Sequence, residues 1–414
     1  MPMTISEKIL AKAAGREKVS PGEIITCKID LICVDEIQIP FFVNTLEKMG
    51  TDAVGKERTV FVIDHHCPPT SLNQARANQM TRNFAISKGL ILLEGGIKDQ
   101  LLWENGYVRP GIILVGTDSH ITTCGALGAF AAAFGPSDAA IMSVKGEYWF
   151  KVPATIRCEI VGTLKPFVTP KDIGLYILGQ KGVTFANYKS IEFCGTTTRN
   201  LSIDGRVTLC NMSTEMGAKN GIVEADSVTG DFLKKRKVTN INKMSSDPDA
   251  LYAESFVVDA SKLDPLVAFP HSPGNVRNIS EARGIKIDQG FIGSCGNGNM
   301  DDLRIAAQIL KGNTVHKNTR LIITPASREL HLQALSEGLI EIFLKAGAIV
   351  SGTTCSVCAG FEGCLLPKET CITSSPRNFQ GRMGSPEALI YLGSPATVAA
   401  SAVKGEITDP REFL

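Results

Sequence analysis

The segment "GIKIDQGFIGSCGNGNMDDLRIAAQILKG" (residues 284–312) passes from a short apolar run through a loop rich in Gly and Asn into a helical pattern. Three other apolar runs also end in polar or charged residues: "RTVFVIDHH" (58–66), "GIILVGTDSH" (111–120) and "RLIITPAS" (320–327). Continuous apolar strands that alternate with helices are typical of buried parallel sheets. We therefore predict an α/β fold with mainly parallel sheets.

The residues able to perform chemistry directly follow these apolar runs. "DHH" follows "VFVI", "TDSH" follows "IILV" and "SC" follows "GFIG". In parallel sheets, ligands bind at the carboxyl ends of the strands, where loops present polar groups. We therefore expect the functional residues to gather at these sheet edges.

Composition excludes several classes of function. The net charge of +1 implies no general electrostatic attraction to nucleic acid or to an anionic membrane. The N-terminal residues mix acids and bases, and no apolar run reaches the roughly 18 residues of a membrane span. We expect a cytoplasmic protein with neither a nucleic-acid nor a membrane partner. The apolar segment "ALGAFAAAFG" (126–135) is shorter and predicts a buried helix.

The pattern of residues changes at 150–162, and Pro and Gly residues interrupt the chain at 268–276. Both positions suggest domain boundaries. We predict three α/β domains at 1–152, 153–273 and 274–414, and "VTPKDI" (168–173) predicts a helix start with a Thr cap and Pro in the first turn. The basic "FLKKRKV" (232–238) and the following "SSDPDA" (245–250) predict a solvated loop.

Twelve cysteines are scattered between residues 27 and 371 of this long chain, which argues against a disulfide framework. The segment "GTTCSVCAGFEGC" (352–364) nevertheless contains three of them, and Cys355 and Cys358 have C-x-x-C spacing. A structural zinc site needs four ligands, which Cys364 and Cys371 could complete. Spacing alone leaves zinc, plain buried thiols and an iron–sulfur cluster open.

Cys295 adds a third thiol at the turn from a strand into a helix. The neighbouring glycines allow the backbone to approach a bulky cofactor, and Asn297 can donate hydrogen bonds there. The helix that follows presents free N–H groups to an anion. Three thiolates on a four-iron cluster would leave one iron open, as a Lewis-acid catalyst requires.

Several motifs resemble the aconitase superfamily, most closely the large subunits of 3-isopropylmalate dehydratase and homoaconitase. They are "GTDSHITTCGALGAFA" (116–131), "IGSCGNGNMDDLRIAAQIL" (292–310), "RNFQGRMGS" (377–385) and "YLGSPATVAASAVKGEITDP" (391–410). The resemblance covers the full length in the same motif order. It implies a hydro-lyase of leucine biosynthesis that isomerises a 2-hydroxy diacid through an alkene. It also implies three domains around a [4Fe–4S] cluster held by Cys295, Cys355 and Cys358, with one iron not bound by cysteine.

Removal of hydroxide from a hydroxy acid requires an acid, a base and cations that hold the carboxylates. The resemblance implies roles for specific residues. It implies catalytic roles for Asp64, His65, Asp118, Ser119, His120 and Glu215, substrate binding for Arg377, Arg382 and Ser385, and cluster support for Asn211 and Asn297. We expect His66 to be structural.

The sequence also departs from the family pattern. The usual C-G-P-C is "CSVC" and the usual S-C-T-N is "SCGN", while Pro376, Asp99 and Glu36 replace Asn, His and Asp respectively. The cysteines stay while their surroundings differ, and such surroundings tune reactivity and substrate fit. We therefore expect a dehydratase of the 3-isopropylmalate type whose substrate is isopropylmalate, a citrate-like or homocitrate-like acid, or a methyl- or aryl-substituted malate.

The chain ends in "ITDPREFL" (407–414), after the motifs of the third domain. The resemblance implies that a separate small subunit supplies the swivelling domain and the serine base, so we expect a heteromeric enzyme. Two other hypotheses compete. One is a non-catalytic iron–sulfur sensor or RNA binder on the same fold, and the other is a zinc protein that uses the cysteines at 355, 358, 364 and 371.

Overall fold

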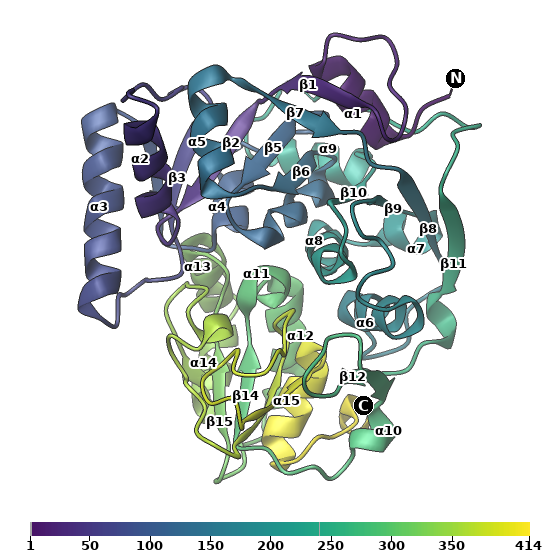
Figure 1. Ribbon diagram of the computed structural model, residues 1–414. Helices are drawn as coiled ribbons and strands as arrows, with labels where there is room; N and C mark the ends of the chain where they lie inside the picture. The colour runs from purple at the N-terminus through teal and green to yellow at the C-terminus, as the bar shows by residue number, and fades with distance from the viewer. Residues whose placement is uncertain (1, 240) are drawn as a thin grey trace. The chain divides into compact units, whose positions relative to one another are not determined.

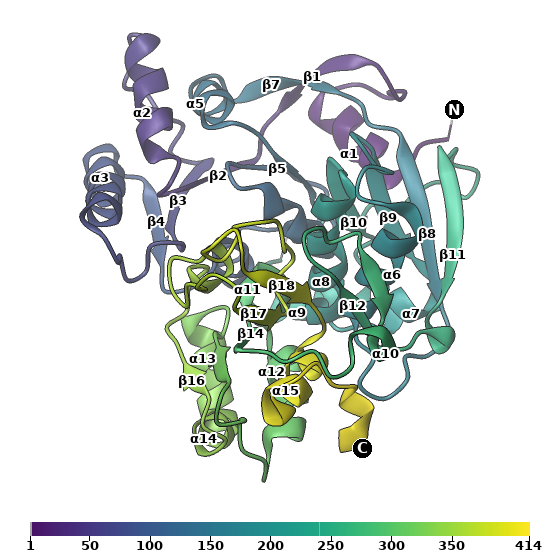
Figure 2. The ribbon, with the colours of Figure 1, turned by 60° about the horizontal axis from the view of Figure 1, so that its bottom comes forward.

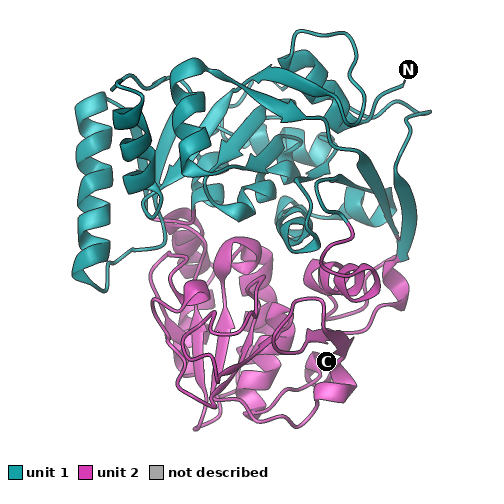
Figure 3. Cartoon of the chain, in the orientation of Figure 1, with its two compact units in different colours: residues 1–94, 98–160, 186–258 teal, residues 95–97, 161–185, 259–414 magenta. Residues whose placement is uncertain are grey.

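The computed structural model describes residues 2–239 and 241–414. These residues form two compact units, which are coloured separately in Figure 3. Unit 1 contains residues 1–94, 98–160 and 186–258, and unit 2 contains 95–97, 161–185 and 259–414. The three-domain boundaries stay a prediction. Within the described ranges, no helix combines the length and apolar character needed to cross a bilayer.

Unit 1 is built mainly from strands that alternate with helices (Figure 1). Its elements are α1 (Ile5–Ala13), β1 (Ile24–Lys28), β2 (Leu31–Asp35), α2 (Ile39–Lys48), β3 (Thr59–Ile63), α3 (Leu72–Lys88), β4 (Ile91–Glu94), α4 (Lys98–Glu104), β5 (Ile113–Gly116), η1 (Ser119–Leu127), β6 (Phe130–Ala133), α5 (Pro136–Lys145), β7 (Glu147–Lys151), β8 (Thr155–Val161), β9 (Ser190–Cys194), α7 (Gly195–Asn200), α8 (Ile203–Ser213), η2 (Thr214–Met216), β10 (Asn220–Val223), α9 (Ser227–Lys235) and β11 (Glu254–Asp259).

The main sheet of unit 1 has five parallel strands in the order β4-β3-β2-β5-β6. Strands β2, β3 and β5 are buried along their whole length, as continuous apolar runs predict. Helix α2 packs against α3 and α5, and the rings of Phe42, Phe61 and Phe84 meet edge to face at 5.5–6.2 Å. Such aromatic pairs each contribute about 0.5–1.5 kcal/mol beyond their buried area.

A second sheet of unit 1 has the order β10-β9-β8-β11, and β1 pairs with β7 as an antiparallel ribbon. The 3-10 helix η1 packs against α8 and β10. The backbones of η1 and β10 lie very close together at Gly125, where an added Cβ would lie 1.7 Å from the Gly221 carbonyl oxygen. Only glycine fits at residue 125 without movement of the backbone.

Unit 2 contains the second large sheet. Its elements are α6 (Pro170–Lys181), η3 (Ala260–Lys262), β12 (Leu266–Ala268), β13 (Val276–Asn278), α10 (Ile279–Ala282), β14 (Gln289–Ile292), α11 (Ser294–Asn297), α12 (Met300–Leu310), β15 (Arg320–Ile323), α13 (Arg328–Ser336), α14 (Leu339–Lys345), β16 (Ile349–Val350), η4 (Val357–Ala359), β17 (Thr370–Thr373), β18 (Leu389–Leu392), α15 (Pro395–Lys404) and η5 (Pro410–Phe413).

The strand order in unit 2 is β13-β12-β18-β17-β14-β15-β16. Figure 2 labels β12, β18, β17, β14 and β16 of this sheet. The strands from β18 to β16 run parallel, whereas β12 pairs antiparallel with both of its neighbours. Helix α15 packs against β14 and α12. The carboxyl ends of five parallel strands therefore lie along one edge of this sheet, and the α/β prediction is confirmed.

The predicted helix start at 168–173 is confirmed. Thr169 and Asp172 form a capping box at the first turn of α6, with Pro170 in the first helical position. Two helices, α13 and α14, follow β15, and Gly338 separates them with a left-handed φ of 74°.

Two local predictions are wrong. Residues 126–132 of the segment 126–135 are buried, but the segment contains the strand β6 in place of a helix. Gly128 ends η1 in the left-handed region at φ 79°, and Phe130–Ala133 then pair with β5. Residues 232–235 are the last turn of α9, whose N-cap Asp226 accepts from the Thr229 N–H, so the solvated loop begins only after them.

Candidate active site

Acidic and imidazole side chains cluster at the carboxyl edge of the main sheet in unit 1. Asp35 and Glu36 end β2, Asp64–His66 follow β3, and Asp118–His120 follow β5. These three strands are neighbours in the parallel sheet, so their ends present these side chains together. The prediction that these residues gather at a strand edge is confirmed.

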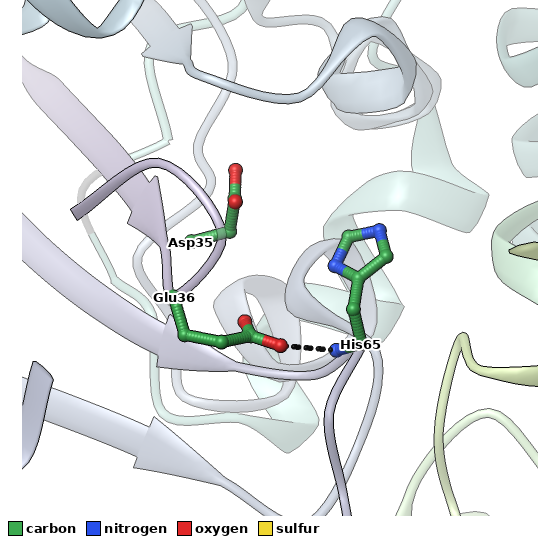
Figure 4. A group of neighbouring side chains, drawn as sticks. All are labelled: Asp35, Glu36 and His65. Atoms are coloured by element: carbon green, nitrogen blue, oxygen red, sulfur yellow. Dashed lines mark hydrogen bonds between the residues drawn. The ribbon is translucent and has the colours of Figure 1, made fainter. Parts of the chain in front are cut away.

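The turn that carries His65 is fixed by hydrogen bonds to its backbone and its ring. The Glu36 carboxylate accepts from the N–H groups of Asp64, His65 and His66 at 3.2, 2.9 and 2.6 Å, and Figure 4 shows the bond to His65. Asp64 Oδ1 lies 2.7 Å from His65 Nδ1, and Asp64 Oδ2 accepts from the Lys98 N–H. His65 is therefore held in one orientation with a carboxylate on one ring nitrogen.

Asp118 is the centre of a second set of contacts. Its Oδ1 lies 2.9 Å from Lys98 Nζ and accepts the backbone N–H of His120 at 2.8 Å. Its Oδ2 lies 3.8 Å from His65 Nε2. Lys98 also lies 3.4 Å from the buried carboxylate of Asp99. A buried ammonium thus compensates two carboxylates beside the His65 ring.

His120 forms the third carboxylate–imidazole contact of unit 1. Its Nε2 lies 2.9 Å from Glu215 Oε1, and both side chains are buried. Glu215 belongs to η2, which follows α8. In α8, Asn211 donates to the Thr123 hydroxyl, and the Ser119 carbonyl accepts from the Thr214 hydroxyl. An amide bond from α8 and a hydroxyl bond from η2, both to η1, thus place Glu215 against His120.

The electrostatics of this cluster favour charged forms at specific residues. Burial lowers the pKa of His65, but Asp64, Glu36 and Asp118 outweigh it and raise that pKa well above its usual range. Burial raises the pKa of Asp118, yet Lys98, His120 and His65 bring it well below its usual range. Burial and Asp64 raise the pKa of Glu36 to about 7. The arrangement therefore stabilises a protonated His65 beside an ionised Asp118.

Asp35, Glu36 and His65 (Figure 4) each offer one atom within 4.8 Å of the others, as a bound metal ion would require. These oxygens already have protein donors. Glu36 accepts three backbone N–H groups, while Asp35 accepts the Thr117 hydroxyl at 2.6 Å and the Gln38 N–H at 3.2 Å. The hydrogen bonds explain this grouping, so we assign no ion to it.

Unit 2 presents three buried thiols at the carboxyl edge of its sheet. Cys295 lies in α11 after β14, Cys355 lies in the loop after β16, and Cys358 lies in the 3-10 helix η4. The three residues are 6%, 5% and 2% exposed, respectively. The Cys355 thiol hydrogen-bonds with the thiols of both Cys295 and Cys358. Residues sixty positions apart are therefore brought together, as the sequence predicts.

The chemistry of these thiols suits a metal cluster. Hydrogen bonds from Cys295 and Cys358, with burial, raise the pKa of Cys355 well above its usual range. The hydrogen bond with Cys355 lowers the pKa of Cys358, and the Arg382 guanidinium, with Nη2 3.6 Å from Cys358 Sγ, lowers it further against the effect of burial. The metal-binding form is the thiolate, which these contacts favour at Cys358, whereas Cys355 would release its proton as the metal binds. Three cysteines gathered at one sheet edge are the kind of donor set that iron–sulfur clusters use.

The turn before Cys295 has an unusual backbone. Gly293 has a φ of 156° and Ser294 a φ of 81°, in a region that non-glycine residues rarely adopt. Such conformations persist where the surroundings fix them, often at functional sites. Ser374 provides part of that constraint, since its hydroxyl accepts from the Gly293 N–H at 3.1 Å.

The four-cysteine zinc alternative is not assembled. Cys371 lies in β17 in register with Gln289, the first residue of β14, whereas Cys295 follows the last residue of that strand. Several strand residues at about 3.3 Å each therefore separate Cys371 from Cys295 along the sheet. Cys364 is exposed, unlike the three buried thiols.

The predicted substrate residues of unit 2 lie on the loop after β17. Arg377 and Arg382 are both partly exposed, and Arg382 is the one that contacts Cys358. The Ser385 hydroxyl accepts from the Glu387 N–H, so it stabilises a turn in this structure. Asn297 donates to Asp302, the capping residue of α12, at 3.2 Å.

The structure places three further charged residues beside the predicted site residues, which sequence reasoning missed. Lys98 pairs with Asp118, and Asp35 stands beside His65. In unit 2, the buried Lys171 donates to the Ser375 carbonyl, two residues before Arg377. A single lysine in "GIKDQ" or "TPKD" has no local pattern that identifies a partner 20 or 204 residues away. The available signal was the position of a lysine close to a motif that follows a strand, which could have marked it as a partner of the acidic residues there.

Residues 7–284 and 280–405 match the aconitase family (aconitate hydratase). The chain is 46% identical to a 3-isopropylmalate dehydratase large subunit of Heliobacterium modesticaldum, with all of both chains covered. It is 45% identical to the protein of that name from Aquifex aeolicus, covering all of this chain and 98% of that one. A 3-isopropylmalate dehydratase large subunit 1 of Methanopyrus kandleri is 44% identical, again over both full lengths. The chain therefore belongs to the aconitase family of hydro-lyases.

Proposed function

We propose that the chain is the catalytic large subunit of a dehydratase that isomerises 3-isopropylmalate or a closely related substituted malate. The single observation that carries this proposal is the set of three buried thiols at 295, 355 and 358. The relatives named large subunits of 3-isopropylmalate dehydratase support the substrate class. A non-catalytic sensor would not need carboxylate–imidazole pairs. Unit 1 contains such pairs, and they favour the enzyme over the sensor hypothesis.

Family membership implies a [4Fe–4S] cluster, and we assign its ligands to Cys295, Cys355 and Cys358. When bound through three cysteines, such a cluster supplies a Lewis-acid position for a hydroxyl and a carboxylate oxygen. Arg382 stabilises the Cys358 thiolate through its guanidinium. Asn297 and Asn211 are proposed to support the cluster.

Unit 1 supplies the proton-transfer groups in this proposal. His65, held by Asp64 at 2.7 Å and facing Asp118, is placed to donate a proton to a departing hydroxyl. Glu215 and His120 form a second pair that exchanges a proton with the reacting oxygen on the return step. Ser119 and Asp118 orient the substrate from the start of η1.

The substrate's carboxylates require cations, which Arg377 and Arg382 provide as forked donors. Ser385 is proposed to contribute through its backbone, since its hydroxyl caps a turn. The base that removes the carbon-bound proton is proposed to come from a separate small subunit, as the name "large subunit" of the relatives suggests. Activity is therefore expected only from the assembled heteromer.

The test is anaerobic reconstitution of the full chain with iron and sulfide, followed by assay with and without its small subunit. Substrates are 3-isopropylmalate, citrate, homocitrate and methyl- or aryl-substituted malates. We expect turnover of 3-isopropylmalate by the complex and none by the chain alone. Turnover by the isolated chain would overturn the partner assignment. Turnover of another substituted malate alone would change the substrate within the same reaction class.

A further inference from the structure

The turn Asp64–His66 is held by two side chains to which the proposed reaction assigns no role. Glu36, at the exit of β2, accepts three successive N–H groups of the turn at 2.6–3.2 Å. Asn78, in α3, donates through Nδ2 to the His66 carbonyl at 2.7 Å. Both side chains are buried. One residue thus binds the donors of the turn and the other binds its acceptor.

The two residues differ in charge, and this difference separates their effects on His65. Asn78 is neutral and reaches the turn only at the His66 carbonyl. Glu36 is an acid, and its carboxylate and a ring nitrogen of His65 lie within 4.8 Å of each other. Only Glu36 can therefore act on both the position and the charge of His65.

We propose that Glu36 is a positioning residue that fixes the His65 turn and holds the His65 imidazole in its cationic, proton-donating form. The resemblance leads one to expect an aspartate at this position, and the glutamate found here accepts from all three N–H groups. The role of His65 as proton donor rests on the proposed function. The effect of Glu36 on His65 charge does not.

The groups that face the Glu36 carboxylate come from the ends of two strands. They are Asp35 at the end of β2, and Asp64, His65, His66 and Cys67 after β3. Asp118, after β5, faces His65 and Asp35. Glu36 ionises at about pH 7, whereas the pKa of His65 lies well above its usual range. Glu36 therefore carries its negative charge when His65 loses its proton, so removal of that charge must lower the His65 midpoint.

The experiment is a nitrogen-15 histidine NMR titration of the full chain with its reconstituted cluster. The chain contains only six histidines, so His65 can be assigned by its loss in His65→Gln. We expect Glu36→Gln to lower the His65 midpoint by about one pH unit, as loss of a neighbouring carboxylate requires. The matched neutral control, Asn78→Ala, is expected to move it by less than about 0.3 units.

Activity and cluster content complete the test. With its small subunit, Glu36→Gln should lose roughly tenfold or more in kcat, with KM changed less than about twofold and iron content unchanged. An unchanged His65 midpoint in Glu36→Gln, or an equal shift in Asn78→Ala, would overturn the proposal. If Glu36→Gln does not fold, Glu36→Asp decides: it keeps the charge, so the His65 midpoint must stay while kcat falls.

This design separates the inference from the function on which it partly rests. The NMR midpoint requires no substrate. A shifted midpoint without any hydro-lyase activity in the wild type would sustain the role of Glu36 in His65 charge and reject the proposed reaction. Normal activity in Glu36→Gln with a shifted midpoint would reject Glu36 as a positioning residue.

Discussion

Lys98 Nζ lies 2.9 Å from Asp118 Oδ1, and the Lys98 side chain is only 2% exposed. This ion pair links the first residues of α4 to the turn after β5. Burial of an ammonium and a carboxylate carries a large desolvation cost, and loss of one partner leaves the other charge uncompensated. The pair therefore makes the geometry around His65 depend on a residue that is not itself a proton donor in the reaction.

Replacement of Lys98 by Met should destabilise unit 1 by about 3 kcal/mol, because the buried Asp99 and the partly buried Asp118, whose side chain is 22% exposed, would lose their cation. Urea unfolding of the full chain measures this change. The matched control is Lys8→Met, which breaks the partly exposed pair with Asp247, and we expect a loss below about 1 kcal/mol there. Equal losses in the two variants would show that the Lys98 pair behaves as a surface contact.

Replacement of Cys295, Cys355 or Cys358 by Ser should abolish retention of a four-iron cluster, because each supplies one of three thiolates. Iron and acid-labile sulfide per chain are the measurements. Cys371→Ser is the control: it alters a buried thiol within β17, so stability falls while iron and sulfide are retained. Zinc without sulfide in the wild type would contradict the cluster assignment.

Arg377→Gln should raise KM for the acid substrate strongly, because a guanidinium–carboxylate contact is lost. A loss of about 2–3 kcal/mol corresponds to roughly 30- to 150-fold in kcat/KM. Arg320→Gln is the control. Arg320 is the first residue of β15 and pairs with Glu369, so the KM of this variant should stay near the wild-type value. A KM in Arg377→Gln equal to that of this control would remove Arg377 from substrate binding.

The unfolding free energy should fall as the pH rises from 4.5 to about 7, in part through Glu36. Burial and Asp64 raise its pKa from 4.5 to about 7, so the folded state binds more protons than the unfolded state in this window. The stabilisation is complete below 4.5 and is lost as the pH passes about 7. Denaturant unfolding of Glu36→Gln should show a flatter dependence. Parallel curves for variant and wild type would reject the shifted pKa.

Gly125→Ala should destabilise unit 1 by about 2 kcal/mol or more, since its Cβ would overlap the Gly221 carbonyl oxygen. Gly230→Ala provides a control within α9, where an added Cβ meets nothing within 4 Å. We expect that control to gain up to about 1 kcal/mol from helix propensity. Thermal unfolding of both variants tests the packing of η1 on β10.

The sequence predicts the sheet edges well because their signals are local. Each strand before Asp64, Asp118 and Cys295 is a continuous apolar run, and the polar residues follow it at once. Segment 126–135 lacks such a boundary. Its Ala, Gly and Phe residues satisfy both helix and strand patterns, and pairing of β6 with β5 decides between them.

The parts that sequence patterns do not predict are long-range contacts of single side chains. Glu36 is recognisable as a departure from the family pattern, but its three hydrogen bonds are formed with residues 28 to 30 positions later. Lys98 likewise meets Asp118 through the adjacency of strands β4, β3, β2 and β5 in the sheet. Sequence spacing does not encode which loops become neighbours at a sheet edge.

The near-complete burial of the three thiols has a consequence for their reaction with reagents in solution. Cys295, Cys355 and Cys358 are 6%, 5% and 2% exposed, whereas Cys364 is exposed. A thiol-specific alkylating reagent should therefore modify Cys364 first, and mass spectrometry of the labelled chain would show that order.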